Sequence, residues 1–350
     1  MSSVDVVVPC YNYAHYLPFA VESALNQRDV DVRVLILNDQ SPDNTAEIGA
    51  RLAAQDARVT YQLNEKNLGL IGTANRGIDW VTADYYVLLS ADDALTPGAL
   101  ARAAEVLDKH KHVHLVYGRA LVMGAENPAP IADVANVRSQ IISGPDFLRR
   151  NIDFTNPVPS PTAIIRTEAQ RRVGKYNPSL PHTSDMEMWM RFAALGPVAV
   201  IRDAQAYYRV HNASMSESFN AQVLRDRREI IQTCSLVVDQ LGDELPESRE
   251  WLQGLKRRFA DEAFWLAGKA WEAGDDAKMK ARLEFAEANH PEAWRSRAAW
   301  GLRVKRALGR KLFHAMRPER GDDAHVAETG TEAGSYQAQT GEIGWWPGGH

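Results

Sequence analysis

Residues 85–95, YYVLLSADDAL, decide the expected fold, because an apolar run ends at two adjacent acidic residues, Asp92 and Asp93. The run has the length and composition of a buried strand. Adjacent carboxylates at the end of a buried strand repel each other and lose hydration, so they favour a compensating cation. A divalent metal bound to a phosphate-bearing ligand would supply one. The alternative is a solvated turn before a helix, because turns favour Asp.

Around this stretch, the first half of the chain alternates strand and helix patterns. Apolar strands are expected at 4–8, 32–37, 59–63 and 85–89. Helices are expected at 17–27, 71–81 and about 97–110, and Ser41 is the expected cap of another that begins at Pro42. Apolar strands separated by helices predict an α/β fold, in which helices cover both faces of a mostly parallel central sheet.

Polar residues recur where these strands end. Tyr11 and Asn12, Asp39, the segment 67–69, and Asp92 with Asp93 all follow predicted strands. Ligands of parallel sheets bind beyond the carboxyl ends of the strands. Loops far apart in the chain therefore converge on one edge of the sheet, which predicts a binding site there.

The rest of the chain has a different organisation. Short strands at 114–117, 162–165, 198–201 and 206–210 alternate with turns up to about residue 211, and the pattern beyond 217 is helical. The region from about 318 is rich in Gly, Thr and Glu and has little periodicity. We therefore expect a domain at 1–215, a C-terminal all-helical appendage at 216–317 and a disordered tail at 318–350.

Composition narrows the class of protein. The 350 residues are 45% hydrophobic and 24% charged with a formal net charge of −5, as in an ordinary globular protein with no nucleic-acid partner. Two cysteines form no disulfide framework, and there is no signal-peptide pattern or apolar run long enough for a bilayer. We expect a cytoplasmic protein that is able to lie against the inner face of the membrane.

Four individual residues suggest chemistry, each with an ordinary alternative. Asp39 could accept the imino N–H of uracil or thymine, or it could be a turn former or a helix cap. Tyr11 could stack on the same base, or it could be a surface aromatic residue. Asp185, in the first turn of a helix predicted at 185–195, could be a general base, or it could complement the helix dipole. His211 could bind a metal or a phosphate, or it could be a surface histidine.

Together these residues resemble the family 2 glycosyltransferases, which have the GT-A nucleotide-sugar-binding fold. The resemblance covers roughly residues 3–215. It rests on five stretches in the family's order: VDVVVPCYNYAHYLPFAVESALNQ, LNDQSPDNTAEI, NEKNLGLIGTANRGI, YYVLLSADDAL, and TSDMEMWMR with YYRVH.

The resemblance implies a role for each matching residue. Asp39 would hold the base and Tyr11 would pack on it. Asp92 would lie near the ribose, and Asp93 would hold Mn²⁺ or Mg²⁺ on the diphosphate. Asp185 would be the catalytic base of a single inverting displacement. The residues implied to bind the donor nucleotide are Pro9, Tyr11, Asn12, Asp39, Asn67, Gly69, Asn75 and Asp92, and the implied metal ligands are Asp93 and His211.

Some positions depart from the family pattern. Asn38 replaces a frequent Asp, and Ser184 replaces a frequent Glu before the base. Ser90 and Ala74 replace an acidic residue and an Arg, so the recognition of the sugar is open. The Gln-x-x-Arg-Trp signature of processive polysaccharide synthases is absent, which favours the addition of a single sugar.

A basic segment at 291–317 follows the helical pattern. Trp300, Val304, Leu308 and Leu312 recur every four residues among Arg and Lys. On a helix this forms an apolar stripe flanked by cations, which suits an anionic membrane surface. The alternative is a solvated helix packed on the preceding helices.

The expected function is the transfer of a sugar from a nucleoside-diphosphate sugar, UDP- or dTDP-linked, to a hydroxyl of a glycan or lipid-linked acceptor. This chemistry belongs to the synthesis of cell-surface polysaccharides or glycoconjugates. A nucleotidyltransferase is the first alternative, but it would carry a Gly-rich basic loop after the first strand, and PCYNYAHYL has none. A non-catalytic nucleotide-sugar-binding scaffold is the second alternative.

Overall fold

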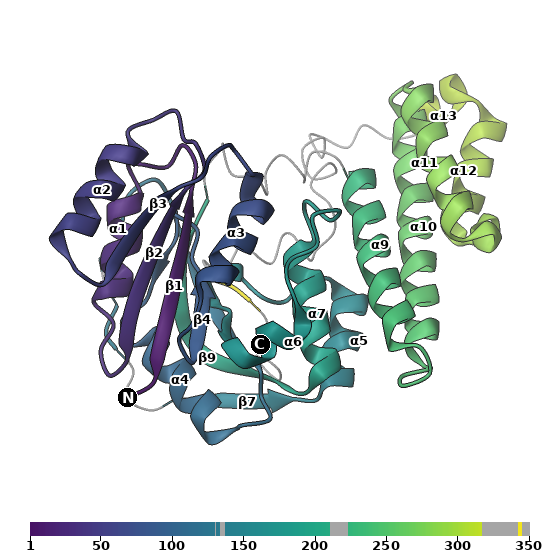
Figure 1. Cartoon of the computed structure of the whole chain (residues 1–350). Helices are drawn as coiled ribbons and strands as arrows, with labels where there is room; N and C mark the ends of the chain where they lie inside the picture. Colours follow the sequence, from purple (N-terminus) through teal and green to yellow (C-terminus); the bar gives the residue numbers. More distant parts are fainter. Residues whose placement is uncertain (130, 134–136, 211–222, 317–341, 345–350) are drawn as a thin grey trace. The chain divides into compact units, whose positions relative to one another are not determined.

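The computed structural model describes residues 1–129, 131–133, 137–210, 223–316 and 342–344. Close packing divides the chain into two units, 1–214 together with 333–350, and 215–332. The first unit is built on a sheet, and the second consists of helices (Figure 1).

Parallel pairing of apolar strands builds the first half of the sheet. The strands are β1 (Ser3–Cys10), β2 (Asp31–Asn38), β3 (Val59–Leu63) and β4 (Tyr85–Leu88), in the spatial order β3-β2-β1-β4. All three pairings are parallel. Because successive side chains of a strand point to opposite faces, an all-apolar strand must be covered on both sides.

Helices provide this cover. On one face, α1 (Leu17–Leu25), α2 (Thr45–Gln55) and α4 (Ala99–Lys109) pack against the core that includes Val6 and Val8. On the opposite face, α3 (Gly69–Trp80) approaches Val7 (Figure 1). The predicted α/β fold with a mostly parallel sheet is confirmed, since the longest pairings of the sheet are parallel.

The second half of the sheet is mixed. Strand β8 (Ile164–Arg166) lies antiparallel between β4 and β6 (Leu115–Met123), and β6 runs parallel to β9 (Val198–Arg209). Two short strands, β5 (Ala94–Leu95) and β7 (Ser139–Ile142), pair antiparallel with β9. The helices of this half are α5 (Gly144–Phe154), α6 (Thr167–Val173) and α7 (Ser184–Leu195), and η1 (Ser160–Thr162) is a single 3₁₀ turn.

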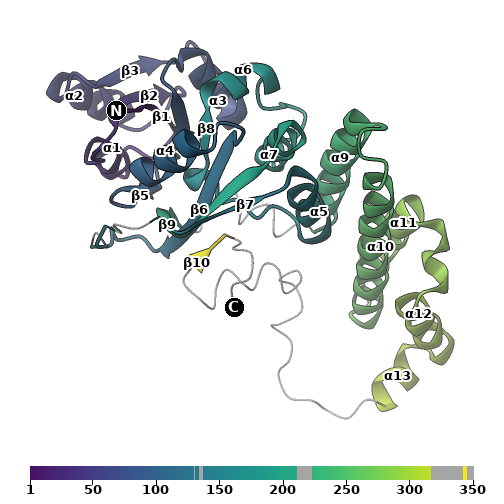
Figure 2. The same ribbon diagram turned by 90° about the horizontal axis from the view of Figure 1, so that it is seen from below.

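A short strand near the end of the chain joins the same sheet. Strand β10 (Glu342–Ile343) pairs antiparallel with β6 at Leu121 and Ala120 (Figure 2). The buried side chain of Ile343 packs with Ala120 and Ala206. The sequence did not predict this strand. Apart from 342–344, the residues of the expected tail at 318–350 lie outside the described part of the chain.

The second unit is helical throughout its described residues. It contains α9 (Val223–Leu241), α10 (Ser248–Glu272), α11 (Asp276–Asn289), η2 (Pro291–Arg295), α12 (Arg297–Leu308) and α13 (Arg310–Met316). Helix α10 packs against α9, α11 and α12, and it buries Leu255 and Phe264. Among the described helices, none combines the length and the apolar character that a membrane span requires.

Two local predictions were wrong. The helix expected from Pro42 begins at Thr45, and Ser41 does not cap it, because the Ser41 hydroxyl donates to the Asp43 carboxylate and accepts from the backbone N–H of Asn12. The strands expected at 198–201 and 206–210 form one strand, β9, because Asp203 and Gln205 between them are buried and the N–H of the exposed Arg202 donates to the carbonyl of Arg138 at 2.9 Å.

Close packing of α3 on β1 gives a test of the fold. A Cβ atom at Gly77 would lie 2.3 Å from Cγ1 of Val7 and 3.4 Å from Cδ1 of Leu37. We expect Gly77→Ala to lower the free energy of unfolding of the first unit by about 1–3 kcal/mol, because overpacking outweighs the helix propensity of Ala. Equilibrium urea unfolding measures the change. The control Gly124→Ala meets no atom within 4 Å, and equal stability of the two variants would contradict the packing.

Candidate active site

Loops that are far apart in the chain meet at the carboxyl end of the parallel strands. The sheet register pairs Cys10 with Asn38, so the loops after β1 and β2 leave the sheet side by side. The backbone N–H of Asp39 donates to the carbonyl of Cys10 at 3.0 Å. Strand β4 lies on the other side of β1 and leads to Asp92 and Asp93. The topology therefore brings these predicted site residues to one edge.

The Asp39 side chain is buried and held by its neighbours. Its Oδ1 atom accepts hydrogen bonds from Nδ2 of Asn64 at 2.6 Å and from the backbone N–H of Leu68 at 2.7 Å. The Arg76 guanidinium donates to the Asn64 side chain in turn. The carboxylate thus organises the loop that carries two other predicted residues, Asn67 and Gly69. Both are exposed, and the backbone N–H of Gly69 donates to Oδ1 of Asn67 at 3.0 Å.

The loop after β1 presents an aromatic ring. Tyr11 is 48% exposed and follows the buried residues Pro9 and Cys10. Asn12 has a φ of +63°, a left-handed conformation that Asn tolerates better than most residues, and its N–H donates to Oγ of Ser41 at 2.6 Å. Strained backbone at this point turns the chain away from the sheet directly after Tyr11.

Asp43 anchors this loop, although the sequence did not single it out. Burial opposes its charge, but hydrogen bonds from Ser41, Thr45 and the N–H of Ala14 outweigh burial and lower the pKa of Asp43 to about 2. The carboxylate therefore stays charged and connects the loops after β1 and β2.

The acidic pair lies in contrasting environments. Asp93 is buried, and its Oδ1 accepts a hydrogen bond from the backbone N–H of Arg209 at 2.9 Å. Burial and the neighbouring Asp92 carboxylate raise the pKa of Asp93 well above its usual range. Asp92 is half-buried, and its carbonyl accepts a bond from Nε of Arg209 at 2.9 Å.

Arg209 is the main site residue that sequence reasoning missed. It is 1% exposed at the end of β9, and its guanidinium donates to the carbonyls of Gly124 and Ala125 at 2.6 and 2.8 Å. It also donates to Asn127 at 2.6 Å and lies 4.2 Å from the centre of the Tyr16 ring. The sequence held one signal, since Arg209 directly follows the apolar residues 206–208. An Arg at the end of an apolar strand is expected to be buried, and a buried guanidinium needs several hydrogen-bond acceptors around it.

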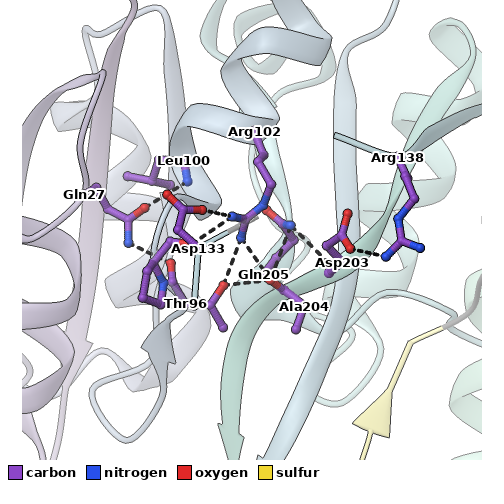
Figure 3. Close-up of polar contacts among 10 residues, drawn as sticks. Gln27, Thr96, Leu100, Arg102, Asp133, Arg138, Asp203, Ala204 and Gln205 are labelled. Atoms are coloured by element: carbon purple, nitrogen blue, oxygen red, sulfur yellow. Dashed lines mark hydrogen bonds and ion pairs between the residues drawn. The ribbon is translucent and has the colours of Figure 1, made fainter. Parts of the chain in front are cut away.

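A buried polar network fixes β5, which directly follows the acidic pair. The Thr96 hydroxyl donates to the carbonyl of Ala204 on β9 at 2.7 Å, and Arg102 of α4 donates to the same carbonyl at 3.0 Å. Arg102 also binds the Asp133 carboxylate, and Gln27 of the segment after α1 donates to the carbonyl of Thr96 (Figure 3). The network therefore holds the backbone on the C-terminal side of Asp93.

Asp185 lies in a cradle of donors at the start of α7. Oδ2 accepts bonds from Oγ of Ser160 at 2.9 Å and from Nδ2 of Asn156 at 3.0 Å, and Oδ1 accepts one from the N–H of Met186 at 2.6 Å. Burial raises the pKa of Asp185, and these hydrogen bonds oppose the rise. Ser160 belongs to η1, which packs against β4 and β5, so the cradle is tied to the strands that flank the acidic pair.

Two other predicted residues have different positions. The Asn75 amide exchanges hydrogen bonds with the backbone of Tyr176, at 2.9 and 2.8 Å, so it connects α3 to the segment before α7. His211 lies outside the described residues.

The described residues fit a hard divalent cation in part. Adjacent carboxylates at Asp92 and Asp93 are the oxygen ligands that Mg²⁺ and Mn²⁺ prefer, and the cost of burying the Asp93 charge falls when a cation is near. No group of three His, Cys, Asp or Glu side chains suited to a metal occurs among the described residues. Of the described residues, Asp93 would therefore be the ligand, with the Asp92 carboxylate next to it.

Residues 5–192 match a known protein family. The family model for glycosyl transferase family 2 matches residues 5–192, more than half of the chain. The chain belongs to glycosyltransferase family 2. The resemblance seen in the sequence is thereby confirmed.

Related proteins share this region with the present family 2 glycosyltransferase. An uncharacterized glycosyltransferase of Haemophilus influenzae is 27% identical over 222 residues, which cover 62% of this chain and 68% of that protein. Chondroitin synthase of Pasteurella multocida is 24% identical over 259 residues, 71% of this chain but 25% of the synthase. This chain thus matches only a quarter of that enzyme.

Solved structures confirm the GT-A fold. S. aureus TarS 1-349 in complex with UDP-GlcNAc aligns with a TM-score of 0.54 at 16% identity, covering 81% of this chain and 90% of TarS 1-349. The mannosyltransferase PcManGT of Pyrobaculum calidifontis, in complex with GDP-Man and Mn²⁺, aligns with a TM-score of 0.52 at 18% identity, covering 87% and 79%.

The contacts of Arg209 lead to a stability prediction. Arg209→Gln removes a buried cation and leaves several carbonyl groups without a donor, so we expect a loss of about 2–4 kcal/mol. This corresponds to a fall of about 5–15 °C in the melting temperature of a unit of this size, measured by differential scanning calorimetry. The exposed Arg202 on the same strand provides the control Arg202→Gln, with an expected shift of about 1 °C or less. Similar melting temperatures for both variants would show that Arg209 does not secure the site.

Proposed function

We propose that this family 2 glycosyltransferase transfers a sugar from a nucleoside-diphosphate sugar, UDP- or dTDP-linked, with inversion at the anomeric carbon. The acceptor is a hydroxyl of a glycan or a lipid-linked molecule, in the synthesis of cell-surface polysaccharide or glycoconjugate. One observation carries the proposal. A buried carboxylate with a raised pKa, Asp185, is held by a cradle of donors tied to the strands that flank the acidic pair.

The nucleotide of the donor binds at the rim formed by the loops after β1, β2 and β3. Asp39 accepts the imino N–H of the pyrimidine through Oδ2, because the described bonds from Asn64 and Leu68 both reach Oδ1. Tyr11 supplies a half-exposed ring to pack on the base. Pro9, Asn12, Asn67 and Gly69 shape the surrounding loops. Asn75 contributes to the shape of the site because its hydrogen bond to the carbonyl of Tyr176 fixes the position of α3.

The diphosphate lies beside the acidic pair. Mn²⁺ or Mg²⁺, held by Asp93 with His211 as a further ligand, would neutralise the negative charge that grows on the leaving nucleoside diphosphate. Asp92 contacts the ribose side of the donor. The backbone N–H of Arg209 donates a hydrogen bond to the Asp93 carboxylate, which fixes the orientation of that side chain.

Asp185 acts as the general base. It takes the proton of the acceptor hydroxyl as the oxygen attacks the anomeric carbon, while the bond to the diphosphate breaks. Its raised pKa makes the carboxylate a stronger base, and the hydrogen bonds from Ser160 and Asn156 keep the group charged and oriented. We place this reaction in the cytoplasm, where nucleotide sugars would be the donors.

Replacing the base gives the direct test of this function. With a UDP- or dTDP-sugar, Mn²⁺ and an acceptor, Asp185→Asn should lower kcat by about 10²–10⁴-fold, because amides do not accept the proton. Binding of the nucleoside diphosphate, measured by calorimetry, should change little. Asp79→Asn, at an exposed ion pair with Lys175, is the control. Turnover of Asp185→Asn near that of the unchanged protein would remove Asp185 from the role.

The cradle predicts a defined pH effect. Asp185 must be deprotonated to act, so kcat/KM falls as the pH drops through its pKa. Ser160→Ala removes a hydrogen bond that lowers this pKa, so the acid limb of the pH profile should move to higher pH. Ser179→Ala, an exposed serine bonded to Asn177, should leave the limb in place. A shift to lower pH, or no shift, would contradict the assignment.

A further inference from the structure

The last two helices of the second unit leave large apolar side chains in solvent. Trp300 is 67% exposed, Leu312 is 51% exposed and Met316 is 65% exposed. Val304 and Leu308 are exposed between them. Residues four apart lie on the same side of a helix, so Trp300, Val304 and Leu308 share one side of α12, and Leu312 and Met316 share one side of α13. We name these five residues the C-terminal apolar face.

Other side chains attach the same helices to their unit. Leu302 and Ala299 of α12 are buried, and the Phe313 ring of α13 meets the Trp271 ring edge-on at 5.8 Å. Lys305 forms an ion pair with Glu272 at 2.5 Å, and Arg310 forms one with Asp276. The apolar face is therefore not the side on which the helices pack.

Positive charge lies beside the C-terminal apolar face. Residues 293–317 contain no Asp or Glu. The side chains of Arg297 and Lys311 are exposed and form no ion pair with the residues that the structure describes. These cations differ from Lys305 and Arg310, which are paired within the unit.

We propose that α12 and α13 bind the surface of a bilayer rich in anionic phospholipid. The apolar face would enter the boundary between headgroups and acyl chains, and the unpaired cations would contact lipid phosphates. An indole ring such as that of Trp300 favours this boundary, because one edge is polar and the rest is apolar. No described helix is suited to span the bilayer, so the contact is interfacial.

Charge complementarity selects this partner over others. A continuous run of 25 residues without an acid matches a uniformly anionic surface, whereas protein interfaces mix both signs of charge. A nucleic acid would use the cations but would leave the five apolar side chains in water. Binding to lipid requires no nucleotide sugar, so this inference and the proposed function succeed or fail separately.

Vesicle sedimentation of the full chain tests the proposal. With vesicles of phosphatidylcholine and phosphatidylglycerol, and no nucleotide sugar, we expect the protein to pellet. With phosphatidylcholine alone or at high salt, it should stay in the supernatant, because the attraction to charged lipids is screened or absent.

Two double variants separate the cations from the apolar face. The exposed cations are reversed in Arg297→Glu with Lys311→Glu, which should weaken the partition into anionic vesicles by about tenfold or more. The apolar contact is removed in Trp300→Ser with Leu312→Ser, which should weaken it by about tenfold as well. All these side chains are exposed, so melting temperatures should match the unchanged protein.

Matched controls lie on other helices of the same unit. Arg257→Glu with Lys280→Glu makes the same change of charge on α10 and α11, and Trp265→Ser with Leu236→Ser removes the same types of exposed apolar side chain from α10 and α9. Both controls should pellet like the unchanged protein.

Three results would overturn the proposal. The first is an unchanged protein that stays in the supernatant with anionic vesicles. The second is sedimentation that the test variants and the controls share equally. The third is self-association in solution, without vesicle binding, that Trp300→Ser with Leu312→Ser abolishes, because the face would then bind protein.

Discussion

The site depends on one unfavourable arrangement, a buried carboxylate next to a second carboxylate at the end of a strand. Asp93 lies in this position, and its raised pKa expresses the cost of charging it there. The protein keeps the group in place through the backbone N–H of Arg209, and the Arg209 guanidinium is satisfied by carbonyls and by Asn127. Burial costs stability at Asp93, and the proposed divalent cation would offset that cost.

Rigid support around the acidic pair comes from elements distant in sequence. The network of Thr96, Arg102 and Gln27 holds β5 on one side of Asp93, and β4 enters on the other. The cradle of Asp185 is tied to the same strands through η1. Because each partner packs on the sheet, the geometry of the site follows from the fold more than from its own loops.

Much of the first unit follows from local pattern. The strands at β1 to β4 are continuous apolar runs, and their all-apolar character requires a covered parallel sheet, so the sequence predicted the fold and the convergence of Asp39 with the acidic pair. The sequence predicts two strands in place of β9 because Arg202, Asp203 and Gln205 interrupt its apolar pattern. Their partners, such as Arg138 for Asp203, are distant in sequence and cannot be inferred from spacing.

The same limit explains what was missed at the site. Arg209 and Asp43 act through partners that only the folded chain brings together, whereas Asp92, Asp93 and Asp185 belong to short motifs. Strand β10 was also missed, since two residues carry no periodicity, and its pairing with β6 depends on Ile343 meeting Ala120 and Ala206.

Strand β10 also changes how the polypeptide is connected. The chain leaves the first unit after β9, forms the helices α9 to α13, and returns to add a strand to the sheet it left. In the order of the chain, the helical unit is therefore an insertion between two parts of the first unit. Ending the polypeptide after α13 would therefore leave the backbone of β6 unpaired at Ala120 and Leu121. An unpaired strand edge of this kind can form hydrogen bonds with a strand of another protein chain.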